Sequence, residues 1–146
     1  MPHRGRDCRV FLDANVLFSA AYRDNAGLQM LWKLRGVQLV TSWYAAQEAA
    51  NNLPEEGQQL RLRTLLEGVE MVADGAEVGA ATSGLWAEMV LPDKDRPIFA
   101  AALTAKSDFL LTGDVRHFGM YFGQEVRGIR TLRPAEFLKW FHASDL

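Results

Sequence analysis

Residues Arg9 to Leu17 read RVFLDANVL, and they join an apolar run directly to a carboxylate. The run Val10 to Leu12 predicts a buried strand, and the apolar segment after Asp13 predicts a helix. Asp13 therefore stands at the carboxyl end of a strand, which is where ligands bind in open α/β sheets. A buried charge is costly unless it is paired or holds a metal. The question is therefore which other carboxylates of the chain can converge on Asp13.

A second strand is built in the same way. The apolar run Phe109 to Leu111 is followed by Thr112, Gly113 and Asp114. Because the carboxyl ends of parallel strands lie at one edge of a sheet, two neighbouring strands would bring Asp13 and Asp114 within a few ångströms of each other.

Two further acids can reach the same edge. Asp95 stands just ahead of a helix predicted over residues 98–106. Glu48 is the only charged residue in a helix predicted from about Ser42 to Leu53, where most of its neighbours are alanines or aromatic residues. The sequence therefore predicts a cluster of four acids: Asp13, Glu48, Asp95 and Asp114.

Such a cluster favours a divalent cation. Two like charges 4 Å apart repel by ~4 kcal/mol at an effective dielectric constant of 20, and a bound cation removes that cost. Four hard oxygen donors select magnesium or manganese over zinc or copper. Magnesium held by carboxylates typically serves phosphodiester chemistry, in which the ions activate water and stabilise the leaving oxygen.

Each acid also has an ordinary structural explanation. Asp13 and Asp95 can cap the helices that follow them, Asp114 can be a turn residue, and Glu48 can face solvent. Taken together, four such coincidences are harder to accept than one working site.

Four nearby residues have secondary places in this prediction. Asn15 and Thr112 can orient a ligand or bind a metal-bound water. Asp93 is expected on the loop surface, with an accessory ligand role as the alternative. His117 can touch substrate, but we expect it on a surface loop.

Strands and helices are predicted to alternate along the whole chain, which implies an α/β fold with a parallel sheet covered on both faces. A helix near Leu28, Leu31 and Trp32 is expected to start at Asp24 or Asn25 and to end at Gly36. The expected strands are 10–12, 37–40, 69–73, 109–111 and 129–132. The other expected helices are 16–22, 42–53, 55–67, 82–90 and 98–106, with one more from Pro134, a turn at 74–79, and a loop or short helix at 115–123.

Length and composition are consistent with one ordinary domain over 1–146. About half of the residues, 49%, are apolar, so a hydrophobic core is available. No apolar run approaches the ~20 residues that span a bilayer, and we expect no secretory signal at Met1 to Arg9. Cys8 is the only cysteine, which excludes a disulfide framework and favours a reducing, cytoplasmic setting. The net charge of −2 neither indicates nor excludes a nucleic-acid ligand.

The sequence resembles PIN-domain nucleases over nearly its whole length. The segments that carry the resemblance are LDANVL at 12–17, PDKDRPIFAAA at 92–102, FLLTGD at 109–114 and TLRPAEFL at 131–138. The match at Glu48 rests on its position in a helix. Some members carry a further acid shortly after the last aspartate, where this chain has Arg116 and His117, which leaves open how a second metal would be held.

The resemblance implies a three-layer α/β/α sandwich with a central parallel sheet. It also implies metal-dependent cleavage of RNA, with Mg²⁺ or Mn²⁺ held at positions matching Asp13, Glu48, Asp95 and Asp114. Many small members are toxins of bacterial toxin–antitoxin pairs, like the VapC toxins. We therefore expect RNA and a cognate antitoxin as partners, a homodimer, and no membrane. Arg96 and Arg116, close to the proposed ligands in sequence, are expected to hold RNA phosphates.

Three other functions fit the sequence less well. A dinucleotide-binding domain is disfavoured because no glycine follows Asp13 before Gly27, so the tight phosphate-binding turn is missing. A phosphohydrolase of the haloacid dehalogenase type would want a second acid at the position of Asn15. A PIN-like module that binds RNA or protein without cutting is expected to lose at least one acid, and all four are present.

Overall fold

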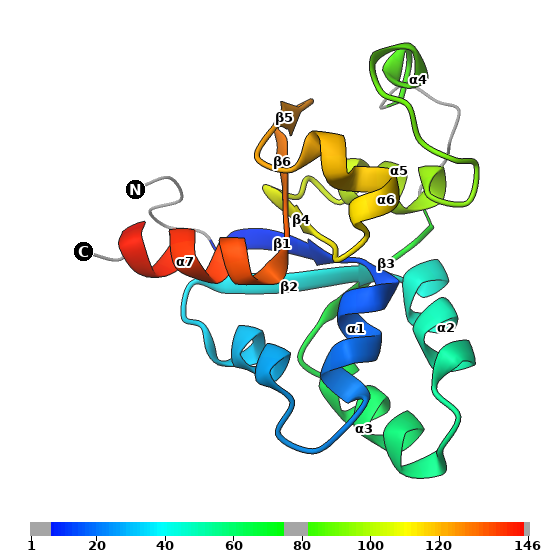
Figure 1. Ribbon diagram of the computed structural model, residues 1–146, viewed down its shortest axis with the longest axis vertical. Coiled ribbons are helices and arrows are strands. Elements are labelled where there is room, and N and C mark those ends of the chain that lie inside the picture. Colours follow the sequence, from blue (N-terminus) through cyan, green and yellow to red (C-terminus); the bar gives the residue numbers. More distant parts are fainter. Residues whose placement is uncertain (1–6, 75–81, 145–146) are drawn as a thin grey trace.

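The computed structural model describes residues 7–74 and 82–144. The expected turn at 74–79 falls, apart from Asp74, outside these residues, as does most of the segment from Met1 to Arg9. The chain forms a six-stranded sheet with the strand order β3-β2-β1-β4-β6-β5 (Figure 1). The strands are β1 (Cys8–Leu12), β2 (Val37–Ser42), β3 (Glu70–Val72), β4 (Phe109–Leu111), β5 (Glu125–Val126) and β6 (Ile129–Leu132).

Strand β1 lies at the centre of the sheet, between β2 and β4. It pairs in parallel with both, and the register sets Leu12 beside Leu111 at the end of β4. The chain builds β2 and β3 on one side of β1 and later adds β4 and β6 on the other. The strand order therefore reverses between β1 and β4, which is where open α/β sheets form their binding crevice.

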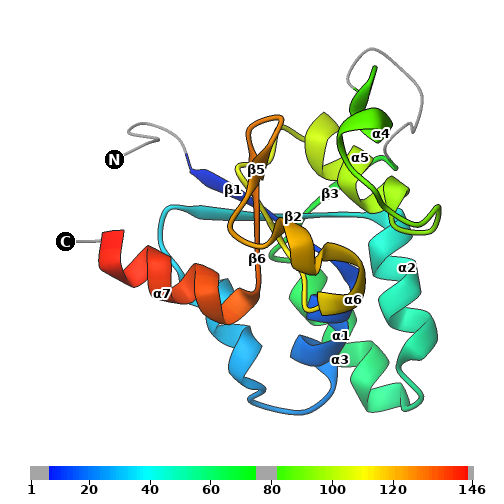
Figure 2. The same cartoon turned by 45° about the horizontal axis from the view of Figure 1, so that its top comes forward.

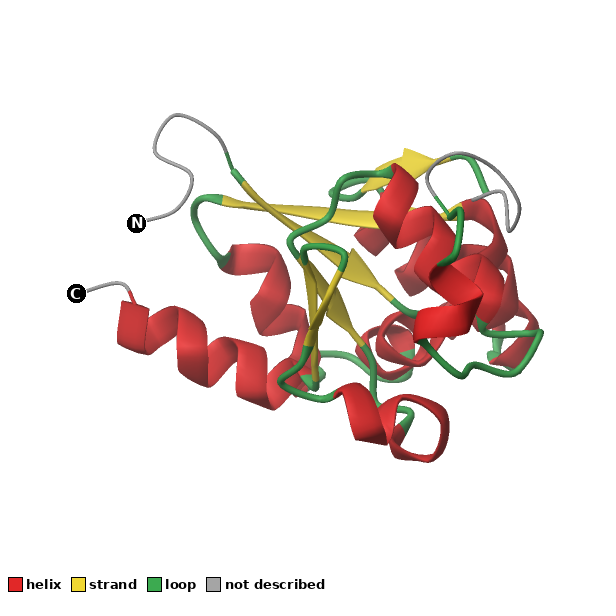
Figure 3. Ribbon diagram, turned by 90° about the horizontal axis from the view of Figure 1, so that it is seen from above, coloured by secondary structure: helices red, strands yellow, loops and turns green. Residues whose placement is uncertain are grey.

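Helices lie on both sides of the strands (Figure 3). On one face of the sheet are α1 and α3, and on the other is α5 (Figure 1). The helical elements are α1 (Ala14–Ala21), η1 (Gly27–Lys33), α2 (Trp43–Asn52), α3 (Glu56–Leu66), α4 (Leu85–Glu88), α5 (Arg96–Thr104), α6 (Val115–Phe118), η2 (Gly119–Tyr121) and α7 (Pro134–Ser144). This arrangement confirms the expected α/β/α sandwich.

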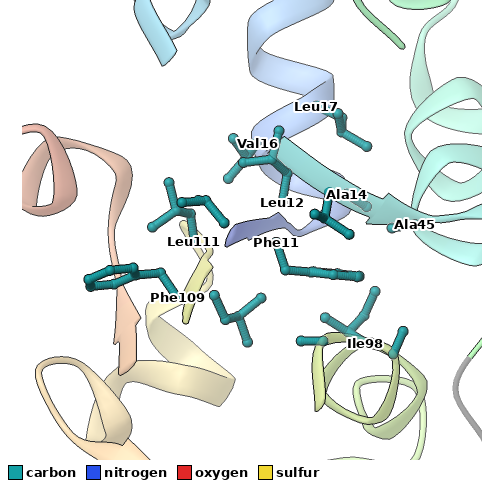
Figure 4. Close-up of a cluster of buried hydrophobic side chains, with 14 of the residues drawn as sticks. Phe11, Leu12, Ala14, Val16, Leu17, Ala45, Ile98, Phe109 and Leu111 are labelled. Carbon is teal, nitrogen blue, oxygen red and sulfur yellow. The ribbon is translucent and has the colours of Figure 1, made fainter. Parts of the chain in front are cut away.

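Strand β1 is a continuous apolar run because both of its faces are buried in the core. Phe11 points toward Ile98 of α5, while Leu12 lies beside Val16 and Leu17 of α1 (Figure 4). Phe11 and Leu12 are both fully buried, because a strand covered on both faces has no solvent side. The pattern that fixes β1 in the core thus also carries Asp13 to the edge of the sheet.

The start of α2 was predicted correctly from its capping residue, whereas α1, capped by Asp13, begins at Ala14 and not at the expected Val16. Ser42 accepts a hydrogen bond from the backbone N–H of Ala45 at 3.2 Å and begins α2. The segment near Leu31 differs from its prediction, because it forms the 3₁₀ helix η1 and begins after Ala26. Asn25 does not cap it but takes a left-handed conformation with φ of 55°, which asparagine tolerates better than most residues.

Two other elements differ from the sequence-based expectation. The helix expected over 82–90 is confined to α4, because Gly84 has a φ of 73° and so interrupts helical backbone before Leu85. Strand β5 was not expected, and it pairs antiparallel with β6 at the edge of the otherwise parallel sheet (Figure 2). Arg127 and Gly128 join these strands with φ values of 53° and 85°, a geometry that usually selects Asn-Gly.

None of the helices in the described residues is both long enough and apolar enough to cross a lipid bilayer.

Candidate metal-binding site

One cavity of about 870 Å³ opens at the carboxyl edge of the sheet. The four predicted acids all line it: Asp13, Glu48, Asp95 and Asp114. Asn15, Gly113 and residues of α1, α2 and α7 complete the lining. They come from the end of β1, the middle of α2, the start of α5 and the loop after β4. The fold therefore brings together four carboxylates that are distant in sequence.

Asp13 is both a helix cap and a part of this cavity. Its Oδ1 accepts a hydrogen bond from the backbone N–H of Ala14 at 2.7 Å, so the capping explanation is correct. Its Oδ2 accepts from the hydroxyl of Thr112 at 2.8 Å and from the amide of Asn15 at 3.2 Å. Asp13 is 5% exposed, and these bonds hold its side chain in one position.

Asn15 and Thr112 form the frame between β1 and β4. The amide of Asn15 donates to the hydroxyl oxygen of Thr112 at 3.1 Å, and its oxygen accepts from the backbone N–H of Gly113 at 2.7 Å. The same hydroxyl oxygen accepts from the N–H of Asp114 at 3.1 Å. A Cβ at Gly113 would lie 3.3 Å from the oxygen of Asn15, so glycine suits this close approach.

The environment of Asp13 disfavours its charged form. Burial raises the pKa of Asp13 to about 6, and the negative charges of Asp95 and Glu48 add to the rise. The hydrogen bonds from Thr112 and Ala14 act in the opposite direction. Repulsion between acids was the cause expected from the sequence, but loss of hydration is the larger effect.

Asp95 stands at the N-cap position of α5 without making a side-chain cap bond. Asp95 is 7% exposed, and Oδ2 accepts no hydrogen bond from the described residues, although Nδ1 of His117 lies 2.9 Å away. Burial raises the pKa of Asp95, although the positive charges of His117 and Lys94 lower it. A buried carboxylate oxygen that faces other acids and accepts no hydrogen bond is suited to bind a cation.

His117 belongs to this site, although the sequence analysis expected it on a surface loop and gave contact with substrate only as the alternative. Nδ1 of His117 lies 2.9 Å from Oδ2 of Asp95 and 2.9 Å from Oδ2 of Asp114, and only the contact with Asp114 has hydrogen-bond geometry. Asp114 also accepts from the backbone N–H of His117 at 3.0 Å and so caps the short helix α6. The expected surface loop position is wrong, because this capped turn folds the ring back onto the two acids. The spacing of three residues after a capping aspartate was the available signal.

Glu48 projects from α2 toward the cavity and is half-buried. It is close enough for its charge to raise the pKa of Asp13. Asp93 lies outside, with its side chain 96% exposed, as expected for a loop residue.

The basic residues at the cavity are not the two that the sequence suggested. Lys94 and Arg133 line the cavity. Arg96 instead lies over the ring of Trp86, with 5.3 Å between guanidinium carbon and ring centroid, and Arg116 is exposed on α6. Neither Arg96 nor Arg116 is among the lining residues. Arg133 reaches the cavity because α7 begins beside it, which no local motif reveals.

The donor set fits a divalent cation. One ligand atom from each of Asp95, Asp114 and His117 lies within 4.8 Å of the others, and the carboxylates of Asp13 and Glu48 face the same cavity. Oxygen donors dominate the set, which suits Mg²⁺ or Mn²⁺. Oδ2 of Asp95, which accepts no hydrogen bond from the described residues, would gain a ligand contact from such an ion.

No protein-family model matches the sequence, and no curated protein matches it. Among the solved structures that share its fold are three from toxin–antitoxin complexes. A toxin–antitoxin complex from Klebsiella pneumoniae has a chain with 19% identity and a TM-score of 0.61, and the match covers 86% of this chain and 97% of that one.

The other two are VapBC complexes. VapBC2 from Rickettsia felis, bound to a DNA fragment of its promoter, shows 16% identity and a TM-score of 0.59, covering 86% of this chain and 98% of that chain. VapBC-1 from nontypeable Haemophilus influenzae shows 16% identity and a TM-score of 0.53, covering 88% and 99%. The chain therefore has the VapC-like PIN-domain fold that its motifs resemble.

Proposed function

We propose that this protein is a metal-dependent endoribonuclease that hydrolyses phosphodiester bonds of RNA. The observation that supports this most strongly is the convergence of Asp13, Glu48, Asp95 and Asp114 on one cavity at the reversal point of the sheet. Two of these acids, Asp13 and Asp95, are buried. A protein has little reason to bury carboxylates together unless a cation is to bind there.

The four acids would hold Mg²⁺ or Mn²⁺, which when bound supplies an activated water and stabilises the leaving oxygen. Thr112 and Asn15 fix the carboxylate of Asp13, and His117 fixes that of Asp114. Lys94 and Arg133 stand at the same cavity and would draw the phosphates of a single strand toward the acids.

We further propose that the protein acts as the toxin of a toxin–antitoxin pair in the cytoplasm, as a homodimer. The structures that share its fold come from toxin–antitoxin complexes. One side of the cavity is apolar, with Val16, Phe18 and Leu28 among its lining residues. An antitoxin can lay an apolar segment on this side and cover the acids.

The alternatives have less support. A phosphohydrolase with a nucleophilic Asp13 would want an acid at Asn15, whose amide is instead held between Asp13, Thr112 and the backbone N–H of Gly113. A binding module without activity would not need four acids at one cavity. A second acid at the place of Asn15 or a missing carboxylate would have favoured these functions.

The test is cleavage of single-stranded RNA by the purified protein in Mg²⁺ or Mn²⁺. We expect products with the wild type, none after EDTA is added, and none with the Asp95→Asn variant. Asp93→Asn is the matched control, because it makes the same change two residues away on an exposed side chain, and it should cut normally. Cleavage that persists in EDTA, or that is lost equally in Asp93→Asn and Asp95→Asn, would rule out this site.

A further inference from the structure

A second, smaller hollow adjoins the acidic cavity. Its volume is about 530 Å³, and it is lined by Trp43, Tyr44, Gln47, Glu48, Asn51 and Asp74. Glu48 lines both spaces. Helix α2 therefore forms a ridge with the acids on one side and the hollow on the other, and α2 lies beside α1 at this end of the molecule (Figure 1).

The helical repeat explains why these residues act together. Trp43, Gln47 and Asn51 follow one another at intervals of four, so they form one stripe along α2. Glu48 is one position further round the helix, facing the acids. A ligand that extends across Glu48 from the acidic cavity would meet this stripe first.

Trp43 gives the hollow an aromatic surface. It is 61% exposed, whereas the other three tryptophans, Trp32, Trp86 and Trp140, are each partly buried. A large ring left in solvent in the first turn of a helix contributes little to the fold. It does offer a flat face on which an unpaired base can stack.

The amides beside Trp43 can read the edge of such a base. Gln47 donates from Nε2 to the oxygen of Asn51 at 2.9 Å. This bond aligns the two side chains, both of which line the hollow, and leaves the oxygen of Gln47 free to accept and the NH₂ of Asn51 free to donate. A paired donor and acceptor is what the hydrogen-bonding edge of a nucleobase requires.

The charge of the hollow favours a base over a phosphate. Asp74 and Glu48 both line it, and none of the six lining residues is basic. The basic side chains, Lys94 and Arg133, stand at the acidic cavity instead. A strand of RNA would therefore keep its backbone on the cavity side of α2 and place a base in the hollow.

Tyr44 connects the hollow to the acids. Its hydroxyl donates to the carbonyl oxygen of Lys94 at 3.0 Å, and its backbone N–H donates to Asp74 at 2.8 Å. Lys94 directly precedes Asp95, so one wall of the hollow is tied to the loop that carries a proposed metal ligand.

We propose that this hollow is a nucleotide subsite. It holds one unpaired base of the RNA, next to the phosphodiester that is cut, stacked on Trp43 with its edge on Gln47 and Asn51. The proposal rests on the proposed ribonuclease function and adds to it the part of the protein that selects the cleavage position.

The experiment is a titration of short single-stranded RNA followed by tryptophan fluorescence, in the Asp95→Asn background with Mg²⁺ so that the RNA stays intact. Binding should quench the emission of the exposed Trp43. The Trp43→Phe variant should lose that quenching but keep most of the affinity. Trp43→Ala should bind roughly 5- to 150-fold more weakly, the equivalent of ~1–3 kcal/mol for one stacked base. Leu60 is also an exposed apolar residue, but it lies on α3 and not at the hollow. The Leu60→Ala variant should therefore bind RNA as tightly as the parent does.

An abasic substitution identifies the base. RNA that lacks the base at one position should bind the parent protein as weakly as intact RNA binds Trp43→Ala. Combining the two changes should cause no further loss, because both remove the same interaction. In the cleaving protein, Gln47→Ala and Asn51→Ala should relax the preference for one base beside the cut.

The outcomes separate the two proposals. If the wild type cuts no RNA, the ribonuclease function fails. If it cuts RNA while Trp43→Ala keeps the wild-type affinity and cleavage pattern, only the subsite is wrong. Quenching of Trp43 by a protein inhibitor and not by RNA would likewise overturn the subsite, and assign the hollow to that partner.

Discussion

The hydroxyl of Thr112 donates a hydrogen bond to Oδ2 of Asp13 at 2.8 Å, across 99 positions of sequence. The two residues follow β4 and β1, and that pair of strands is where the order of the sheet reverses. The same oxygen accepts from the backbone N–H of Asp114. One hydroxyl group therefore fixes the distance between the first and the last acid of the cavity.

Replacing that hydroxyl should destabilise the protein. Thr112→Val keeps the shape but removes one of the two hydrogen bonds that Oδ2 of Asp13 accepts, and it removes the acceptor of the N–H of Asp114. We therefore expect a loss of about 1–3 kcal/mol in the free energy of unfolding. Urea denaturation measures it. Thr112→Ser should restore most of the loss. Thr104→Val is the matched control, since the hydroxyl of Thr104 bonds a carbonyl within its own helix. An equal loss in Thr104→Val and Thr112→Val would mean that the hydrogen bonds of Thr112 contribute no more to the free energy of unfolding than a hydroxyl bond within a helix does.

The metal-free protein should lose stability as pH rises. The pKa of Asp13 rises from 3.8 in its ordinary state to about 6 in the fold. A raised pKa means that its stabilising contribution is complete below the unfolded value and is lost as pH rises through about 6. We expect the EDTA-treated protein to be roughly 2 kcal/mol less stable at about pH 7.5 than at about pH 4.5 from this group.

Asp13→Asn isolates that contribution. The amide oxygen can still accept from Ala14, but the side chain no longer titrates. The difference in stability between wild type and variant, measured by denaturation at each pH, should therefore change with the slope expected for one proton. A pH-independent difference would place the pKa of Asp13 near its ordinary value.

Asp95 and Asp114 should behave differently when each is changed to asparagine. Asp95 makes no cap bond, and burial raises its pKa, so Asp95→Asn should leave the metal-free protein as stable as the wild type or more stable. At Asp114, asparagine keeps an oxygen that can cap α6 but loses the carboxylate that contacts Nδ1 of His117, so Asp114→Asn should lower the stability. Asp114→Ala, which also removes the cap, should cost about 0.5–2 kcal/mol more.

Both variants should lose the stabilisation that a metal gives. For the wild type, Mg²⁺ or Mn²⁺ at a hundred times its dissociation constant adds about 2.7 kcal/mol, which a thermal melt detects as a higher Tm. A normal metal response in both asparagine variants would show that these carboxylates serve only as structural residues.

Lys94 and Arg133 should govern the salt dependence of RNA binding. Replacing both by alanine should weaken RNA binding. It should also reduce the magnitude of the slope of log affinity against log salt concentration by roughly 1.4, which is ~0.7 for each phosphate of a single strand that the protein no longer neutralises. The paired control is Arg96→Ala with Arg116→Ala, the positions indicated by the sequence. Because neither lines the cavity, we expect a smaller change, and the reverse ranking would place the RNA along α5 and α6 instead.

The sequence predicted those residues of the site that stand in a recognisable local pattern. Asp13 and Asp114 each follow a short apolar strand, and the rule that parallel strands end at one edge was sufficient to pair them. Asp95 was found because a proline marks the first turn of the helix after it. Glu48 was found as the only charge in an alanine-rich helix.

The remainder depends on tertiary packing that sequence spacing does not encode. His117 reaches two acids through a single capped turn, and Arg133 reaches the cavity because α7 begins beside it. Arg96 is close to Asp95 in sequence, yet it stacks on Trp86. At Asp13, burial raises the pKa more than repulsion from the other acids does. That burial comes from the packing around the end of β1, which cannot be read from the number of nearby charges in the sequence.

The central place of β1 has a consequence for synthesis on the ribosome. β1 is made first among the strands, but its neighbour β4 follows only after α5. A nascent chain that stops before β4 carries Asp13 on an open sheet edge, without Thr112 to hold it and without Asp114. Such truncated products would be inert, and a cell would meet the proposed activity only once translation had passed the last of the four acids.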